Sequence, residues 1–198
     1  MAVDFQIILG DKNPDLIAAW ERAFEGLPDV RIRGGNILMA SADALVSPAN
    51  SFGFMDGGFD WSISELFEWK IQERVQSVIR SKYAGELLVG QAEIVATNHE
   101  KFPYLICAPT MRIPQNVENS VNAFLAMRAI LLCVERFNLK GVAIKSVAVP
   151  GLCTGVGKMP FERCARQMRE AYDLVCGKSS NQYRNLKAAI DDEIRYKA

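Results

Sequence analysis

The sequence contains a single histidine, His99, and none of its five cysteines forms a CxxC pair. Structural and catalytic zinc sites are built from cysteine and histidine ligands at short, regular spacings. No such spacing occurs, so we expect neither a metal site nor any other bound cofactor. An odd number of cysteines without a signal peptide favours a reducing compartment, and we expect a cytoplasmic protein.

The chain also lacks an excess of charge and any long apolar run. Lys plus Arg and Asp plus Glu both number 23. Proteins that bind nucleic acids at useful salt concentrations need clustered excess cations, so this balance argues against a nucleic-acid partner. No apolar stretch is long enough to cross a bilayer, and we expect no membrane association.

Strand-like and helix-like patterns alternate along the chain. The expected strands cover residues 5–9, 30–33, 45–46, 87–97, 104–108 and 144–149. Between and after the strands, apolar residues recur at helical spacing and predict five amphipathic helices. They begin at or near Leu16, Asp60, Val117, Pro160 and Tyr183. The second runs continuously to near Gly85, the third has Glu118 in its first turn, and the last carries Tyr183, Leu186, Ile190 and Ile194. This alternation predicts an α/β fold, a three-layer α/β/α sandwich around a mixed, largely parallel sheet. With no linker or repeat, residues 1–198 are expected to form one domain.

The stretch around which the chain is organised is 43–63. A short apolar run ends at Pro48, and a loop containing Gly53, Gly57 and Gly58 leads into a helix. Bare N–H groups and the helix dipole favour an anion at such a helix N-terminus. We therefore expect a ligand-binding loop here.

A second glycine-rich loop, 151–158, follows the strand that ends at Val149. It does not match a Walker A loop, because five residues separate Gly151 from Gly157 and Met159 follows Lys158. Neither loop has the G-x-G-x-x-G fingerprint of dinucleotide-binding folds. Parallel strands point their carboxyl ends to one edge of the sheet, so the two loops are expected to form a single cleft.

Together these loops resemble the macro domain, the ADP-ribose-binding module. Val46-Ser-Pro-Ala-Asn50, Gly57-Gly-Phe-Asp60 and Pro150-Gly-Leu-Cys-Thr-Gly-Val156 are similar to the family patterns V-N-x-A-N, G-G-V-D and P-x-x-S-T-G. Gly35-Asn-Ile37 resembles the family's G-D-I stretch. The resemblance covers about residues 30–175, with the motifs in the family's order.

The resemblance implies a role for each matching residue. The distal ribose, the sugar not attached to adenine, would be held by Asn50, and the adenine would lie near Asn36 and Ile37. Asp60 would activate or orient a water, so Asp60 and Asn50 are the expected catalytic residues. The diphosphate would accept from the backbone N–H groups of Gly58 and Phe59, and Cys153, Thr154, Gly155 and Val156 would close over it from the other side. The remaining expected ligand-binding positions are Gly57, Gly151 and Gly157.

Some positions depart from the family pattern. Asn36 replaces an acidic residue expected at the adenine, Ser47 replaces an asparagine, and Gly157 stands where an aromatic side chain often packs on the distal ribose. The chain also has an extra strand and helix before residue 30. We expect the strand at 5–9 to take the sheet position of a late family strand, which would bring Asp11 near the adenine.

Two functions stay open at this point. The resemblance implies a ligand that is ADP-ribose or a derivative, free or attached to a protein. The absence of attached domains favours an enzyme that hydrolyses an ADP-ribosyl linkage, or a 1″-phosphate or acetyl ester on the distal ribose. Ser47 and the missing aromatic favour a non-catalytic ADP-ribose reader. Simpler roles also remain: Asp60 as a charge in the first helical turn, and Asn50 as an Asx-turn residue.

Overall fold

The computed structural model describes residues 4–141, 143–177 and 185–197. Its strands are β1 (Gln6–Asp11), β2 (Val30–Gly34), β3 (Ala44–Ser47), β4 (Glu93–His99), β5 (Phe102–Cys107) and β6 (Ser146–Val149). Its helices are α1 (Pro14–Ala23), the short 3-10 helix η1 (Ile37–Met39), α2 (Gly58–Leu66), α3 (Lys70–Tyr83), α4 (Asn122–Asn138), α5 (Phe161–Val175) and α6 (Leu186–Lys197).

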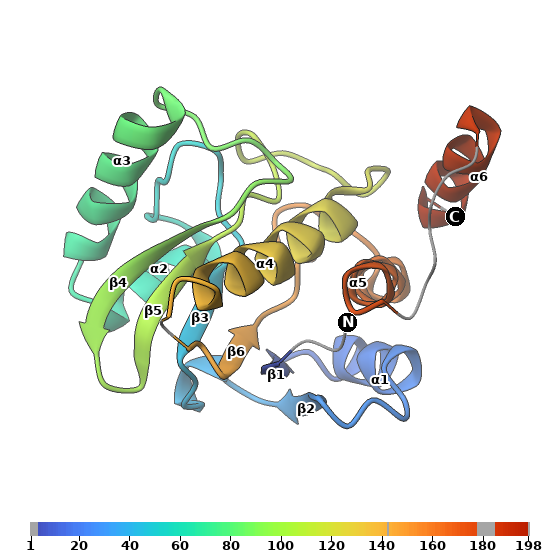
Figure 1. Cartoon of the computed structure of the whole chain (residues 1–198), viewed down its shortest axis with the longest axis horizontal. Coiled ribbons are helices and arrows are strands. Elements are labelled where there is room, and N and C mark those ends of the chain that lie inside the picture. Colours follow the sequence, from blue (N-terminus) through green and yellow to red (C-terminus); the bar gives the residue numbers. More distant parts are fainter. Residues whose placement is uncertain (1–3, 142, 178–184, 198) are drawn as a thin grey trace.

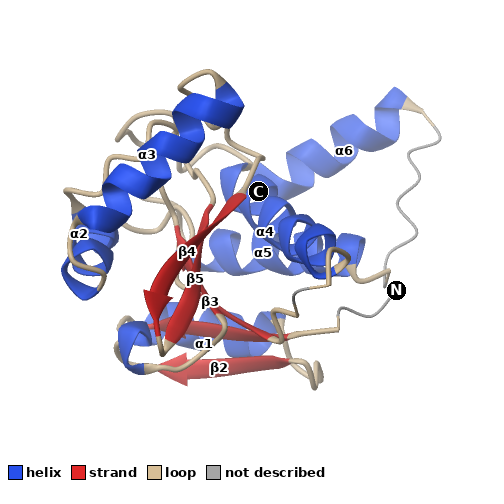
Figure 2. Cartoon of the chain, turned by 60° about the vertical axis from the view of Figure 1, so that its left-hand side comes forward, coloured by secondary structure: helices blue, strands red, loops and turns tan. Residues whose placement is uncertain are grey.

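The strands form one sheet in the order β2-β1-β6-β3-β5-β4. Every neighbouring pair is parallel except β4 with β5, so the sheet is mixed and largely parallel, as the alternation of strands and helices predicts. Helices α2 and α3 lie on one side of the sheet, and α1, α4 and α5 lie on the other (Figures 1 and 2). The result is the predicted three-layer α/β/α sandwich.

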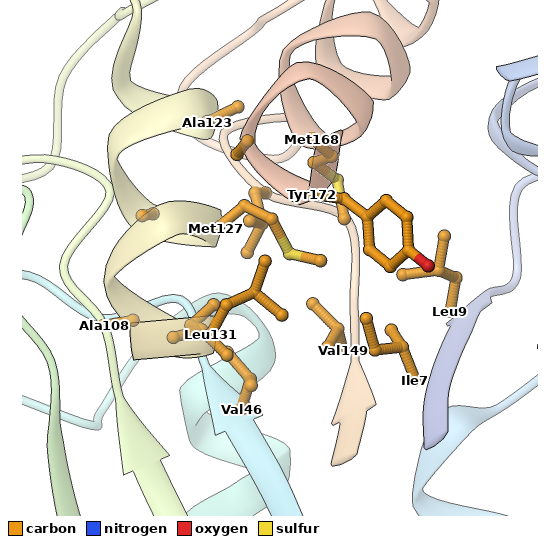
Figure 3. Packing of buried hydrophobic residues seen from close by; sticks show 14 of the residues in the cluster. Ile7, Leu9, Val46, Ala108, Ala123, Met127, Leu131, Val149, Met168 and Tyr172 are labelled. Carbon is orange, nitrogen blue, oxygen red and sulfur yellow. The ribbon is translucent and has the colours of Figure 1, made fainter. Parts of the chain in front are cut away.

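Alternate residues of β3 supply the two faces of the core. Val46 packs in the cluster under α1, α4 and α5, whereas Leu45 packs in the cluster under α2 and α3. Successive side chains of a strand point to opposite faces, so a strand between two helical layers is apolar throughout. Figure 3 shows the first cluster, where Met127 of α4 and Tyr172 of α5 approach the sheet.

The continuous helix expected from Asp60 to Gly85 is wrong. The chain breaks between α2 and α3, where Glu68 and Trp69 adopt left-handed backbone angles, with φ of 58° and 36°. The break is closed by a hydrogen bond from the Trp69 N–H to the Ser64 carbonyl, at 2.8 Å. It lets both helices bury apolar residues, Ile63 from α2 and Ile71 from α3, against the same face of the sheet.

Two other boundaries differ from the expectation by five residues or more. The strand expected from residue 87 begins at Glu93, because a turn through Gly90, with φ of 93°, precedes it. The helix expected from Val117 begins at Asn122, so Glu118 is not in its first turn. In this segment the Ser120 N–H bonds to the Val117 carbonyl, and the Ser120 hydroxyl accepts from the Asn122 N–H, which makes a turn instead of a helix.

The terminal helix α6 is present, but the exposed fractions of Leu186, Ile190 and Ile194 are 76%, 49% and 62%. The helix packs instead through Tyr196, whose ring stacks on Phe124 of α4. Tyr183, expected in the same stripe, lies outside the described residues. None of the helices in the described ranges combines the length and the apolar character needed to cross a membrane.

Candidate functional site

A cavity of about 460 Å³ opens at the carboxyl-terminal edge of the parallel strands. The loops that follow β1, β2, β3, β5 and β6 all contribute to its lining. Parallel α/β sheets bind their ligands at this edge, and ligand sites typically occupy roughly 300–1,000 Å³. The two glycine-rich loops therefore form one site, as their positions in the sequence predict.

The first loop ends at the N-terminus of α2. Gly57 is the residue that precedes the helix, and its lack of a side chain leaves the first turn uncapped. The backbone N–H groups of Gly58, Phe59 and Asp60 make no hydrogen bonds within the described residues. All three residues line the cavity, so this end of α2 presents free donors and a positive dipole to a ligand.

The second glycine-rich loop lines the same cavity. The N–H groups of Thr154, Gly155 and Val156 have no hydrogen-bond partner in the ranges that the structure describes. The loop is held from behind by the Met159 N–H, which donates to the Cys153 carbonyl at 3.0 Å, and by the Val117 N–H, which donates to the Gly157 carbonyl at 2.9 Å. It is therefore a fixed turn that lines the cavity with unpaired donors, which suits an anionic group.

Gly157 is required by this packing. A Cβ atom on Gly157 would lie 2.4 Å from the Cys153 carbonyl oxygen and 2.7 Å from a methyl group of Val117. No side chain fits there while the loop keeps its shape. The absence of an aromatic side chain at this position is thus a property of the loop, and a substitution alone would not restore one.

Asp60 is the buried acid of the site. Its side chain is 8% exposed, and the Ser47 hydroxyl donates a hydrogen bond to its Oδ1 at 2.6 Å. Its Oδ2 makes no hydrogen bond within the described chain, and the residue lines the cavity. Burial raises the pKa of Asp60 to about 6, and the Ser47 hydrogen bond opposes part of that rise. Ser47 is therefore the partner of Asp60, a role that we did not predict.

The side chains of Asn50 and Asn36 are engaged by their own loops. Asn50 accepts from the N–H groups of Phe52 and Phe54, at 3.1 and 3.3 Å, and donates to the Phe54 carbonyl at 2.7 Å. This is the Asx-turn alternative, and one amide hydrogen of Asn50 stays available to a ligand. The Asn36 Oδ1 accepts from the Leu38 N–H at 3.1 Å and caps η1.

Every residue expected in the site lines this one cavity: Asn36, Ile37, Asn50, Gly57, Gly58, Phe59, Asp60, Gly151, Cys153, Thr154, Gly155, Val156 and Gly157. Asp11 lines it as well. The loop after β5 also lines the cavity, through Thr110, Met111 and Pro114, and it was not predicted as part of the site. This loop could have been predicted from Pro109, which ends an apolar strand. A loop that follows a parallel strand lies at the same edge of the sheet as the other loops of the site.

The thiol of Cys153 is expected to be unreactive. Burial raises its pKa above that of an ordinary cysteine, and its sulfur lies 3.9 Å from the Thr110 carbonyl oxygen. Only the thiolate is a good nucleophile. Iodoacetamide at pH 7.5 should therefore modify Cys153 of the native protein far more slowly than Cys153 of the same protein unfolded in denaturant, as measured by peptide mass spectrometry. Equal rates would indicate an accessible thiolate and a nucleophilic residue.

The fold and the site define a three-layer α/β protein with a cavity at the carboxyl-terminal edge of its sheet, lined by two loops with unpaired backbone donors and by the buried carboxylate of Asp60. The family model described as Macro domain matches residues 46–168, which include both loops. The chain therefore belongs to the macro domain family.

Individual relatives agree with this assignment. A protein from Aquifex aeolicus is 34% identical over 143 residues, covering 72% of this chain and 79% of the relative. A macro domain-containing protein from Caldanaerobacter subterraneus subsp. tengcongensis is 30% identical over 158 residues, covering 78% of this chain and 86% of the relative.

Solved structures show the same fold at lower identity. The macrodomain of Mycobacterium tuberculosis DarG superposes with a TM-score of 0.60 at 21% identity, covering 72% of this chain and 88% of its own. A mutant of the Oceanobacillus iheyensis macrodomain, solved with ADPR, gives a TM-score of 0.60 at 16% identity, covering 82% of this chain and 89% of its own.

Proposed function

We propose that this protein binds ADP-ribose, or a group that contains it, in the cavity at the carboxyl-terminal edge of the sheet. The observation that carries the proposal is that two loops line one cavity with backbone N–H groups, those of residues 58–60 and 154–156, that have no hydrogen-bond partner in the described chain. Membership of the macro domain family supports the choice of ligand. So do two structures of the same fold, the Oceanobacillus iheyensis macrodomain with ADPR and Thermosipho africanus DarTG in complex with ADP-ribose.

In this proposal the diphosphate lies between the two loops. Its charge is met by backbone donors and the α2 dipole, as in other helix-terminus anion sites. The distal ribose then lies near Asn50 and Asp60, whereas the adenine lies beside residues 35–37.

We further propose that the protein is a hydrolase. The buried Asp60 carboxylate, with one oxygen held by Ser47 and the other unpaired, is placed to accept a proton from a water or to stabilise positive charge at the anomeric carbon. Candidate substrates are an ADP-ribosyl linkage on a protein, and a 1″-phosphate or an acetyl ester on the distal ribose. The chemistry uses no metal in this scheme.

One observation favours the second candidate, a non-catalytic reader of ADP-ribose. Both ends of the Asn50 amide are committed to the backbone of Phe52 and Phe54, so this residue has limited freedom to position a reacting group. A reader would need only the backbone donors and the shape of the cavity.

Calorimetry with ADP-ribose, together with turnover assays, tests both parts. We expect saturable binding of ADP-ribose, and turnover of at least one of mono-ADP-ribosylated protein, O-acetyl-ADP-ribose and ADP-ribose 1″-phosphate. Asn50→Ala should weaken binding, because it releases the 50–54 turn that shapes the cavity wall. Binding without turnover of any of the three would select the reader, and no binding at millimolar ADP-ribose would remove the proposed function.

A further inference from the structure

Helix α6 presents an apolar row that the described chain leaves uncovered. Leu186, Ile190 and Ile194 recur every four residues, and their exposed fractions are 76%, 49% and 62%. Residues at this spacing lie in a row on one face of a helix. We call these three residues the α6 stripe. Contiguous apolar surface that stays in water marks interaction sites, so the stripe points to a partner.

The opposite face of α6 attaches the helix to its own chain. Ala188, Asp192 and Tyr196 form a second row, two residues out of step with the stripe, and they are buried or half-buried. Two residues correspond to about 200° around a helix, so the rows lie on opposite faces. The Gln167 amide of α5 donates to the Tyr196 carbonyl at 2.9 Å, and Phe124 of α4 stacks on the Tyr196 ring. The α6 stripe therefore faces away from the body of the molecule, at whose edge α6 lies (Figure 1).

Charged side chains border the α6 stripe on both sides. At about 100° per residue, Lys187 and Asp191 lie on one side of it and Glu193 lies on the other. Lys187 and Asp191 are exposed and make no ion pair within the residues that the structure describes, whereas Glu193 pairs with Lys197 at 2.6 Å. One side of the stripe therefore carries two unpaired charges of opposite sign.

This pattern is self-complementary in one arrangement of two helices. When a two-fold axis relates two antiparallel helices, the same side of each stripe comes together, so Lys187 of each copy meets Asp191 of the other. In a parallel pair, opposite sides come together, and Glu193 of one copy would lie beside Asp191 of the other. Like charges would then repel, so the charges favour the antiparallel pair.

We propose that the α6 stripe is the contact surface for a second copy of this chain, in an antiparallel, two-fold symmetric helix pair that crosses near Ile190. The body of each copy lies behind its own helix, so it does not obstruct the approach of the other. A membrane surface is a poorer match, because the sequence of α6, LKAAIDDEIRYK, contains as many acidic as basic residues. Anionic lipids attract helices with an excess of cations.

Sedimentation equilibrium of the full chain, from about 5 µM to about 500 µM, tests the contact. We expect a reversible dimer with a dissociation constant on the order of 100 µM, since three apolar residues per copy bury far less than the roughly 1,200–2,000 Å² of stable complexes. Ile190→Glu should remove the dimer, because two carboxylates would meet where the helices cross. Leu139→Glu is the matched control: Leu139 is 88% exposed at the end of α4 remote from Phe124, and its variant should dimerise like the wild type.

Charge reversal tests the arrangement of the pair. Lys187→Asp and Asp191→Lys should each raise the dissociation constant about fivefold to tenfold, since each places like charges together at two symmetric positions. The double variant restores both pairs and should return the constant to within about twofold of the wild type.

Three results would overturn the proposal. The first is a wild type that stays monomeric over the whole concentration range, and co-sedimentation of that monomer with phosphatidylcholine–phosphatidylglycerol vesicles would assign the stripe to a membrane surface instead. The second is a dimer that Ile190→Glu leaves intact, which would place the contact elsewhere. The third is a double variant that recovers none of the loss caused by the single reversals, which would exclude the antiparallel pairing of Lys187 with Asp191.

Discussion

Replacing Asp60 with asparagine is expected to make the protein more stable at pH 8 and, if the proposed hydrolysis uses Asp60, to lower kcat/KM by a factor of about 100 or more. In the unfolded chain Asp60 has the ordinary pKa of 3.8, whereas in the folded protein burial raises the pKa to about 6. The stability that the protonated side chain provides is complete below about pH 4 and is lost as the pH rises through 6. At pH 8 the folded state carries the full cost of a buried charge, roughly 3 kcal/mol.

Asparagine has nearly the same shape, keeps an oxygen for the Ser47 hydroxyl, and never ionises. Denaturant unfolding at pH 4.5 and pH 8 should show that the advantage of Asp60→Asn over the wild type grows by about 2 kcal/mol between the two values. Asp56→Asn is the matched control, since Asp56 is an exposed acid at the mouth of the same cavity. An equal effect of the two substitutions would show that Asp60 is solvated in the folded protein.

The same substitution tests the catalytic role of Asp60. If the carboxylate accepts a proton, wild-type kcat/KM should fall about tenfold per pH unit below pH 6, and Asp60→Asn should lose a factor of about 100 or more. Ser47→Ala should move the acidic limb to higher pH, because the Ser47 hydrogen bond lowers the pKa of Asp60. A stably folded Asp60→Asn variant with full turnover would show that Asp60 only shapes the cavity.

Gly157→Ala is expected to cost about a factor of 100 in affinity for ADP-ribose. The new methyl group would lie 2.4 Å from the Cys153 carbonyl oxygen, a backbone atom that cannot move without carrying residues 153–156 with it. A shift of the loop would misalign the N–H groups of Thr154, Gly155 and Val156. Losing two or so charge-assisted hydrogen bonds would account for a change of this size.

Gly155→Ala is the comparison within the same loop. A Cβ atom there would meet no atom within 4 Å, so the loop can keep its shape, and the loss of affinity should be several-fold at most. Calorimetry with ADP-ribose measures the affinity of both variants, and thermal melting shows whether each is folded. Equal losses for the two variants would indicate that any added methyl disturbs the ligand and that the packing behind Gly157 is not the cause.

The layers of the fold could be predicted because the spacing of apolar residues along the sequence indicates which faces of a helix or strand are buried. The apolar run around Leu45 and Val46 predicts a strand covered on both faces, and it is so covered. The break at Glu68 and Trp69 could not be predicted, since the apolar stripe continues through it from Ile63 to Ile71. Only the packing of two separate helices on a twisted sheet decides where such a stripe is interrupted.

The loops that meet at the site, and the residues that line it, could be predicted, but the hydrogen bonds within it could not. Glycines and prolines at strand ends indicate a shared edge, so the two loops could be paired from the sequence. The hydrogen bond from Ser47 to Asp60 joins a strand to the next helix, and it depends on the path of the intervening loop. From the sequence, Ser47 is only a departure from the family pattern. Its effect on the pKa of Asp60 follows from the hydrogen bond that the structure shows.

The cavity draws its walls from chain segments on both sides of residue 46. The donors suited to a diphosphate and the buried Asp60 lie within the segment matched to the family, whereas Gly10, Asp11 and residues 35–37 precede it. The wall that holds these donors and Asp60 and the wall formed by residues 10–11 and 35–37 are therefore encoded separately along the chain. Substitutions within the first forty residues can therefore reshape one wall of the cavity without changing any residue of the two glycine-rich loops or Asp60, so the two walls can be varied independently.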